Sequence, residues 1–345
     1  MIKTSSAVYF TFAVALINAL GTVTNESRAI GPQDQTVNPT FDAVVRILYD
    51  KPGSQDAGDG YFNGTGTIIG NHNINGMGVL CVLTADHVVS TTGMFGGALV
   101  SKPGIAFGNS NKVSGNSPYT QSINVMRNGP TGTSDYAVMG VPYGAFNTDY
   151  TALVRNLVTA SSFFEFSDIG YGNEGKLVDQ FPPPGNDGYQ RIDSYGTQRY
   201  LNDKIDTIAT PASNFTSIGY TYTEAAIWYI DNPSDPLAHA GSGTTYDADS
   251  GSPYFSTELD FDESKGIYYF TNNQFAVHTG TDLANNPNNS PNGYKAFGVQ
   301  NFGVALTQAD ITWIHRACDL VTVPEPGSFV LLAMVMFVPF RLRRK

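Results

Sequence analysis

Charged side chains are scarce in this chain of 345 residues and make up only 14% of it. Lys and Arg together number 19 against 30 Asp and Glu, which gives a formal net charge of −11. A protein that binds nucleic acid by displacing counterions needs a basic face, and this sequence has no basic excess to supply one. The composition therefore argues against a nucleic-acid partner and favours a solvated acidic surface.

Cysteine and histidine are also rare, with two and five residues. The histidines stand apart and no Cys-x-x-Cys occurs, so the sequence lacks the spacing typical of a metal site. We predict that the protein needs neither a cofactor nor a metal. Cys81 and Cys318 leave two interpretations open, either a disulfide, which an exported chain permits, or two separate buried thiols.

The first 23 residues predict export. Lys3 precedes the apolar stretch Ala7–Leu20, and a positive start followed by such a stretch is typical of a secretory signal peptide. A buried first helix is the alternative, but the stretch has no polar face of the kind that a helix on a soluble core would carry. We therefore assign residues 1–23 to a signal peptide.

The C-terminal end carries a second targeting pattern. Pro324-Glu325-Pro326 precedes the apolar segment Ser328–Phe340, and Arg341–Lys345 closes the chain with basic residues. This arrangement resembles the PEP-CTERM sorting signal of Gram-negative bacteria, whose tail is removed by an exosortase. The resemblance implies an exosortase-type partner, a membrane contact through residues 321–345, and a location in the cell envelope or outside the cell. A plain membrane anchor is the alternative.

The remaining 300 or so residues are enough for one large domain or two small ones. Gly, Asn, Thr, Ser and Tyr are plentiful, which favours strands and tight turns. Short apolar or alternating runs recur between turn-forming clusters, as in an antiparallel barrel or sandwich. The predicted strands are Val44–Tyr49, Gly66–Ile69, Val79–Thr84, Tyr136–Val141, Asp168–Gly172, Ala225–Ile230 and Gln274–His278, and one helix, capped by Thr307, is predicted over Thr307–Ala317.

Three short motifs contain candidate catalytic residues. In the run Asp249–Pro253, Gly251 allows the sharp turn that would expose Ser250. His87 follows an apolar strand, and Asp135 stands at the head of another. A serine hydroxyl is a weak nucleophile that needs a base, and the base needs an acid to hold its tautomer and stabilise its charged form. The three residues are therefore a candidate catalytic triad.

These motifs, in the order His, Asp, Ser, resemble the chymotrypsin-like serine proteases. The resemblance runs from about residue 35 to residue 318 and implies an all-β fold of two antiparallel six-stranded β-barrels with a C-terminal α-helix. It places the site in the cleft between the barrels and implies one protease domain over residues 24–320. The implied partner is a protein or peptide substrate.

The same resemblance assigns an oxyanion hole and exposes two departures from the family pattern. The hole would be formed by the backbone N–H groups of Ala248 and Ser250. Ala248 stands where the family usually has glycine, and a Cβ there can disfavour the peptide orientation that the hole requires. Asp86 replaces the usual alanine before His87, and its negative charge is expected to raise the pKa of that histidine.

The pocket residues predict a preference for acidic substrates. Thr244 stands where trypsin-like members hold a carboxylate, so the pocket offers no partner for Lys or Arg. Thr245 and His278, with Gly280 in the same wall, resemble the glutamyl-endopeptidase branch, in which a hydroxyl and a histidine bind a substrate carboxylate. We therefore expect His278 and Thr245 to hold an acidic side chain. The alternative is that His278 is an ordinary strand residue with a satisfied ring.

The sequence thus predicts an exported serine endopeptidase in which Ser250 attacks, His87 transfers the proton and Asp135 orients the base. Two alternatives stay open. One is a catalytically inactive envelope or matrix protein on the same scaffold, because a fold does not guarantee a function. The other is an esterase that uses the same three residues.

Overall fold

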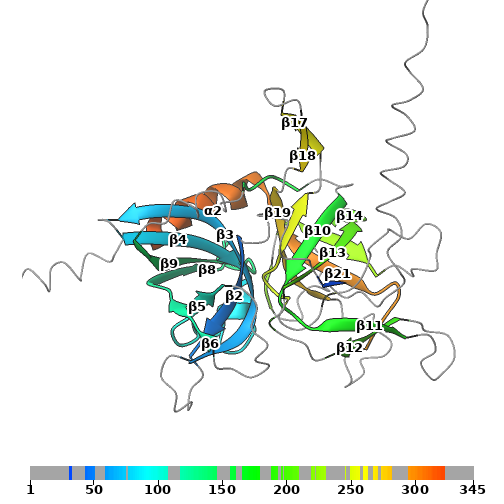
Figure 1. The fold of residues 1–345 in the computed structure, drawn as a ribbon, viewed down its shortest axis with the longest axis horizontal. Coiled ribbons are helices and arrows are strands. Elements are labelled where there is room, and N and C mark those ends of the chain that lie inside the picture. Colours follow the sequence, from blue (N-terminus) through cyan, green and yellow to red (C-terminus); the bar gives the residue numbers. More distant parts are fainter. Residues whose placement is uncertain are drawn as a thin grey trace, which may run out of the picture.

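The fold, taken from a computed structural model, is mostly β-strand (Figure 1). The structure describes residues 31–32, 43–50, 59–74, 77–107, 117–145, 156–160, 165–178, 188–192, 196, 198–209, 219–221, 223–230, 245, 249–256, 259–262, 267–270, 273–281 and 294–322. The predicted signal peptide and the predicted tail beyond Thr322 lie outside these residues. No helix in the described part of the chain combines the length and the apolar character that crossing a membrane requires.

The first sheet is built around apolar strands near the N-terminus. The strand β4 reads MGVLCVLT, and all its residues but the first are buried, as expected for a short continuous apolar run in the middle of a sheet. All strand pairings in the first sheet are antiparallel. The order is β7 (Thr120–Gln121), β5 (Gly104–Ala106), β2 (Val44–Tyr49), β3 (Asp59–Ile74), β4 (Met77–Thr84), β9 (Ala137–Ala145) and β8 (Asn124–Arg127), with β6 (Ser117–Pro118) paired to β3.

The second sheet is formed by the second half of the chain and is also antiparallel throughout. Its order is β1 (Gly31–Pro32), β13 (Arg199–Lys204), β10 (Glu165–Gly170), β16 (Pro253–Ser256), β19 (Gln274–Thr281), β21 (Gln300–Ala305), β15 (Ala225–Tyr229) and β14 (Thr207–Ala209). Two smaller sheets join β11 (Glu174–Val178), β12 (Gly188–Ile192) and β20 (Tyr294–Ala296), and β17 (Leu259–Asp262) with β18 (Ile267–Phe270).

The two-sheet, all-β prediction is confirmed. Each large sheet contains eight strand segments, where six were expected. Segments of two or three residues account for part of this number: β5, β6 and β7 in the first sheet and β1 and β14 in the second. Such short segments carry no hydrophobic periodicity from which the sequence could have revealed them.

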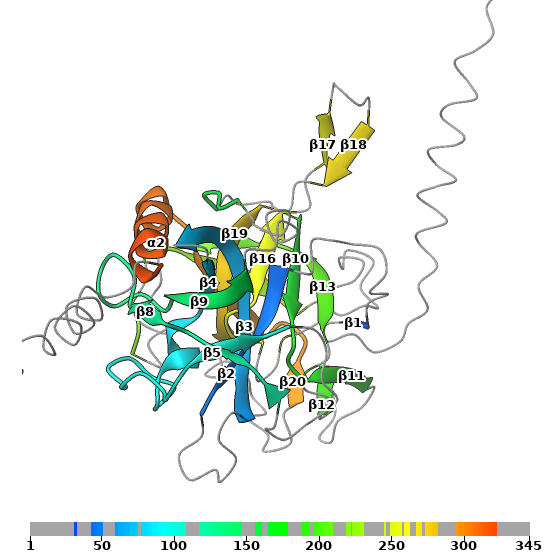
Figure 2. The same cartoon turned by 60° about the vertical axis from the view of Figure 1, so that its left-hand side comes forward.

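The two sheets lie side by side (Figures 1 and 2), and one cluster of buried apolar side chains includes residues of both. The core of the first sheet includes Ile47, Val82 and Val138, and it continues into Val277 and Val304 of the second sheet. A separate core of aromatic side chains, among them Phe166, Trp228 and Tyr254, fills the second sheet. Packed apolar side chains therefore hold the two sheets together at the junction, so polar groups on the neighbouring strands and turns have fixed positions.

One α-helix closes the described chain. It runs as α2 from Gln308 to Val321, and Thr307 caps it through a capping box with Asp310, as the sequence predicted for its start. It extends four residues beyond the predicted end at Ala317. Although α2 follows the last strand of the second sheet, it packs on β9, β4 and β8 of the first (Figure 1).

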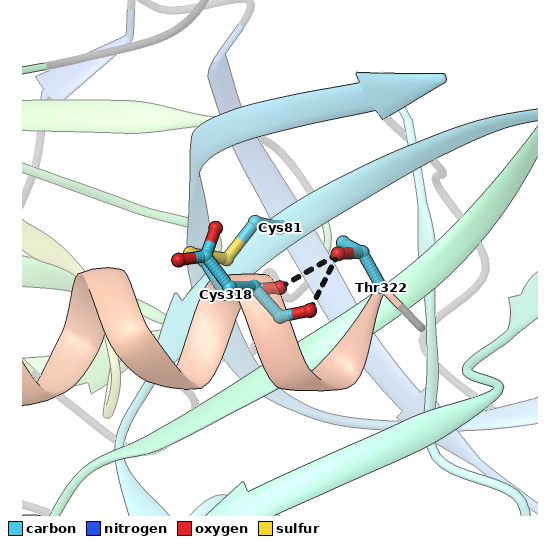
Figure 3. Close-up of a disulfide and its surroundings, with 4 residues drawn as sticks. Cys81, Cys318 and Thr322 are labelled. Atoms are coloured by element: carbon cyan, nitrogen blue, oxygen red, sulfur yellow. Dashed lines mark hydrogen bonds between the residues drawn. A yellow bond between two sulfur atoms is a disulfide. The ribbon is translucent and has the colours of Figure 1, made fainter. Parts of the chain in front are cut away.

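A disulfide joins this helix to the first sheet and settles the question that the two cysteines left open. Cys81 on β4 bonds to Cys318 on α2, with their Cα atoms 5.5 Å apart (Figure 3). Beside it, the Thr322 hydroxyl donates hydrogen bonds of 2.9 Å to the Cys318 carbonyl and 3.0 Å to the Asp319 carbonyl. The end of the helix is therefore fixed covalently and by its cap.

Candidate active site

The first element of the site is the predicted base and its acid. After β4 ends at Thr84, the chain forms the short 3-10 helix η2 (Asp86–Val89), which carries His87. The His87 Nδ1 lies 2.8 Å from Asp135 Oδ2, and the His87 backbone N–H donates to Asp135 Oδ1 at 2.9 Å. Because an ionised carboxylate only accepts, Nδ1 must carry the proton and Nε2 is left as the basic nitrogen. The predicted pairing of His87 with Asp135 is present in the structure.

Burial and neighbouring charges shift the pKa of His87 in opposite directions. Burial lowers the pKa of His87, while the charge and hydrogen bond of Asp135 and the charge of Asp86 raise it, and the net result is a pKa above the ordinary value of 6.5. The His87 side chain is 15% exposed, whereas the Asp135 side chain is fully buried. The expected effect of Asp86 on the base is therefore seen in the structure.

The second element is the turn that carries Ser250. Gly251 has a φ of +86°, a conformation that side chains with a Cβ rarely adopt. The Ser252 N–H donates to the Asp249 carbonyl at 2.8 Å and so closes the turn. Strand β19 holds it from the side, because the Gly251 N–H donates to the His278 carbonyl and the His278 N–H to the Ser252 carbonyl, both at 2.8 Å. Ser250 itself is half-buried at the tip.

The turn lies directly against the element that carries the base. The Thr65 N–H of β3 donates to the Ser250 carbonyl at 2.9 Å. A Cβ placed on Gly64 would lie 2.7 Å from the Val88 side chain and 2.8 Å from that same carbonyl, so η2 and the Ser250 turn flank one glycine. A Cβ on Gly251 would reach the Ala85 nitrogen at 3.0 Å. The structure thus brings the backbone of the Ser250 turn against η2, while no hydrogen bond joins the Ser250 hydroxyl to His87 among the described residues.

Two predicted residues cannot be placed. Ala248, assigned to the oxyanion hole, and Thr244, assigned to the pocket, lie outside the described residues. Both assignments stay predictions. Gly280 lies in β19 after an irregularity in its pairing with β21, and a Cβ built on it would meet nothing within 4 Å. The space beside Gly280 is therefore open, which suits a wall that faces a ligand.

A chain of hydrogen bonds reaches His278. The Trp228 Nε1–H donates to the Tyr254 hydroxyl at 3.0 Å, and that hydroxyl lies 2.7 Å from His278 Nδ1. The phenolic oxygen can accept from the indole and still either donate to Nδ1 or accept from it, and in the tautomer in which the phenol donates, a neutral His278 carries its proton on Nε2. Burial lowers the pKa of His278 well below 6.5, and the charges of Lys295 and His87 lower it further. His278 is therefore neutral, with one N–H to offer.

No hydrogen bond joins Thr245 to His278 among the described residues. Lys295 is close to both, because it bonds to Thr245 and its charge lowers the pKa of His278. The Lys295 ammonium donates to the Thr245 carbonyl and to the Thr281 hydroxyl. Asn301, which is fully buried, accepts at Oδ1 from the Thr245 and Thr281 hydroxyls at 3.2 and 2.8 Å. Its amide nitrogen is buried and has no hydrogen-bond partner among the described residues.

Lys295, Asn301 and Tyr254 were missed in the sequence. Lys295 follows a stretch rich in Asn and Pro and belongs to the short strand β20, where nothing local distinguishes it from a solvated surface lysine. Tyr254 comes four residues after Ser250, so the period-2 alternation of a strand could have indicated that it faces the same side as Ser252. Asn301 could be found only through its pairing opposite Thr281.

Two buried carboxylates lie behind the Ser250 turn. Asp249 Oδ1 accepts from the Gly172 N–H at 2.8 Å, and Asp168 Oδ1 accepts from the Ser252 hydroxyl at 2.5 Å. Burial raises the pKa of Asp168 well above its ordinary value, and the charge of Asp249 adds to this shift. A Cβ on Gly172 would lie 2.4 Å from the Asp249 side chain, so only glycine fits there. These contacts fix the turn from the side opposite β3.

No group of three His, Cys, Asp or Glu side chains suited to a metal ion occurs among the residues that the structure describes. Asp135 holds the His87 ring through Nδ1, which leaves Nε2 able to take a proton from a group placed against it.

No protein-family model and no curated protein sequence matches the chain. Among solved structures it is similar to a Glu endopeptidase in complex with MPD, at 14% sequence identity and a TM-score of 0.44, with 86% of this chain and 99% of that chain covered. It is also similar to a mutant of human heparin binding protein, at 12% identity and a TM-score of 0.44, with 88% of this chain and 100% of that chain covered. At identities this low, the similarity says nothing about the chemistry of the site.

Proposed function

We propose that the protein is a serine endopeptidase. Ser250 attacks the peptide carbonyl, His87 takes its proton and returns it to the leaving amine, and Asp135 orients His87. The observation that carries the proposal is the pair of hydrogen bonds from His87 to a buried Asp135, beside the tight turn of Ser250. The N–H groups of Ala248 and Ser250 would hold the oxyanion.

Labelling with a fluorophosphonate tests this proposal. The wild-type chain should be labelled at Ser250 and should hydrolyse casein, and a Ser250→Ala variant should do neither. Ser101→Ala serves as the control, because it removes an exposed hydroxyl of the first half and should still be labelled. Absence of labelling in the wild type would favour the inactive envelope or matrix protein. Labelling with turnover of simple esters and not of peptides would favour the esterase.

We further propose that the enzyme prefers acidic residues at the cleavage site. His278 is neutral, so it can donate a hydrogen bond but supplies no charge. Lys295 would supply the positive charge, close to Thr245 and His278. A substrate carboxylate would thus meet several donors around one cation, as Asp and Glu side chains require in a partly buried site.

Matched substrates test the preference. Peptides that differ only by Glu or Gln at the cleavage site should be cleaved at different rates, with Glu faster. Lys295→Met should reduce the Glu/Gln ratio at least tenfold, whereas Lys204→Met, which removes an exposed lysine of β13, should leave it unchanged. A wild-type ratio near one would contradict the acidic preference while leaving the peptidase proposal intact.

Export and sorting complete the proposal. Residues 1–23 would direct secretion, and residues 321–345 would contact the membrane and be removed by an exosortase-type enzyme in a Gram-negative bacterium. Residues 24–320 would then form the protease domain in the envelope or outside the cell. Intact-mass measurement of the protein recovered from such a host should show loss of both ends. Retention of the tail on a membrane-bound form would favour the plain anchor.

A further inference from the structure

Asp86 is a fully buried carboxylate directly before His87, and the proposed chemistry does not use it. Its two oxygens accept from Arg127, at 2.7 Å from Nε and at 2.7 Å from Nη2. The Tyr220 hydroxyl donates to Oδ2 at 2.6 Å. A charge this deeply buried requires such partners, because an unpaired one would be strongly destabilising. The three residues therefore form one unit, here called the Asp86 clamp.

The members of the Asp86 clamp come from both halves of the chain. Asp86 begins η2, and Arg127 ends β8 of the first sheet and also donates to the Gly97 carbonyl at 2.9 Å. Tyr220 precedes β15 of the second sheet. The next residue, Thr221, donates from its N–H to the Thr133 carbonyl at 2.9 Å, so this segment is docked on the first half beside the clamp.

Both sides of the peptide between Asp86 and His87 are thereby fixed. On one side the Asp86 carboxylate is held by Arg127 and Tyr220, and on the other the His87 N–H donates to Asp135. The nucleophile belongs to the second half of the chain, as does Tyr220. A bond from Tyr220 to Asp86 is therefore a direct link between the half that carries Ser250 and the helix that carries His87.

We propose that Asp86, held by Arg127 and Tyr220, is a positioning residue that fixes His87 relative to the turn of Ser250. The proposal rests on the proposed triad and extends it to a residue beyond the three. A misplacement of reacting groups by about 1 Å can cost on the order of 100-fold in rate, so a link of this kind bears directly on activity.

The clamp also has an electrostatic consequence. The titratable and charged groups that face His87 are Asp135 before β9, Asp86 on η2 itself and His278 on β19, with Arg127 and Tyr220 behind Asp86. Burial raises the pKa of the Tyr220 phenol, as does its hydrogen bond to Asp86, so Tyr220 stays a neutral donor. Removing the charge of Asp86 would leave Arg127 as an unbalanced cation near His87, and the pKa of His87 would fall.

Three variants of the full chain test the proposal: Asp86→Asn, Tyr220→Phe and the control Asp50→Asn. The control also removes one negative charge from the first half, where Asp50 pairs with Lys102 at 3.1 Å on the surface. The measurements are the titration of the His87 ring by NMR, the rate of fluorophosphonate labelling, and the melting temperature. In Asp86→Asn the ring should titrate at lower pH than in the control. In Tyr220→Phe, which keeps the charge, labelling should slow by about tenfold while the ring titration stays near wild type.

The proposal is overturned if the ring of Asp86→Asn titrates as in the control, or if folded Tyr220→Phe is labelled at the wild-type rate. Should Asp86→Asn fail to fold, the Tyr220→Phe result decides. The ring titration needs no catalysis, so it also separates two failures. Absence of labelling in the wild type would remove the proposed peptidase, whereas an unshifted ring would remove the role of Asp86.

Discussion

The pKa values of two histidines at the junction of the sheets are shifted in opposite directions by their surroundings. His87 is paired with a buried carboxylate and its pKa is raised, while burial and the charges of Lys295 and His87 lower the pKa of His278. In the proposed function the first ring takes a proton, and the second, neutral ring donates a hydrogen bond. Burial lowers the pKa of both rings, so the difference comes from the neighbouring charges, which are negative beside His87 and positive beside His278.

The pH dependence of activity follows from His87. The base must be unprotonated, and its pKa in the folded protein lies above 6.5. The labelling rate should therefore fall as the pH decreases through a value above 6.5, and should be largely lost two pH units or so below it. Rates measured between about pH 5 and pH 9 check this, because a rate that stays flat down to about pH 5 would rule out His87 as the base.

The pH dependence of stability follows from His278. Its folded pKa is lowered well below 6.5, so the folded form stays neutral where the unfolded chain takes up a proton. The stability that His278 contributes is present above about pH 6.5 and is lost as the pH falls from there through the folded pKa. The free energy of unfolding should thus decrease less between pH 7 and pH 5 in His278→Gln than in wild type. His315→Gln, at an exposed position of α2, should show the wild-type decrease.

At the scale of elements, the Ser250 turn is determined by what touches it on three sides. β3 contributes the Thr65 N–H, β19 contributes both backbone groups of His278, and Gly172 after β10 contributes its N–H to Asp249. None of these contacts involves the Ser250 side chain. The turn is therefore a rigid support for a hydroxyl that stays half-exposed.

Gly251→Ala should disrupt that support. The new Cβ would lie 2.2 Å from the Thr65 carbonyl oxygen and 2.3 Å from the Thr84 hydroxyl, in a residue whose φ is +86°. We expect a loss of about 2–5 kcal/mol of unfolding free energy and little labelling. Gly93→Ala is the matched control: its φ is +65° but a Cβ there meets nothing within 4 Å, so it should cost about 1–2 kcal/mol and leave labelling intact. Equal losses in the two variants would show that backbone conformation alone matters.

The sequence predicted these elements well where apolar runs are long. Val44–Tyr49 coincides with β2, and the run Val79–Thr84 falls within β4, because buried strands in the middle of a sheet are apolar on both faces. The short pieces at the sheet margins escaped prediction, and so did β13 and β21, which are six-residue strands in the interior of the second sheet. Of the candidate site, the pairing of His87 with Asp135 was expected from the order of the three motifs and is present in the structure, while the role of Ser250 stays a prediction. Of the Asp86 clamp, the sequence indicated only Asp86, since Arg127 and Tyr220 are brought to Asp86 by the fold alone.

At the scale of the whole molecule, the disulfide holds together parts that are 237 residues apart. Cysteine spacing could not predict it, because both a strand and a helix can bury a free thiol. It ties α2 to β4, the strand that leads into η2 and His87. The bond closes a long loop of the unfolded chain and reduces its conformational freedom.

Replacing both cysteines by alanine should therefore lower the unfolding free energy by about 2–5 kcal/mol. Denaturant titration of the oxidised wild type and of the double variant checks this value. The rate of fluorophosphonate labelling at neutral pH should change little, since Cys81 is buried within β4 and is not itself a residue of the site. Reducing agent should destabilise the wild type and leave the double variant unaffected. A variant as stable as the wild type would show that packing of α2 alone holds the helix.

The position of this bond also has a mechanical consequence. Thr322 is the last described residue of the helix end, and it lies only four residues beyond Cys318 (322 − 318). A pulling force on the chain beyond Thr322 can unwind that last turn, but at Cys318 it is transferred through the sulfur bridge to β4, in the middle of the first sheet. The load is then shared by the hydrogen bonds of β3, β4 and β9 acting together in shear. A domain tethered by its C-terminal end would in this way resist being peeled open from that end.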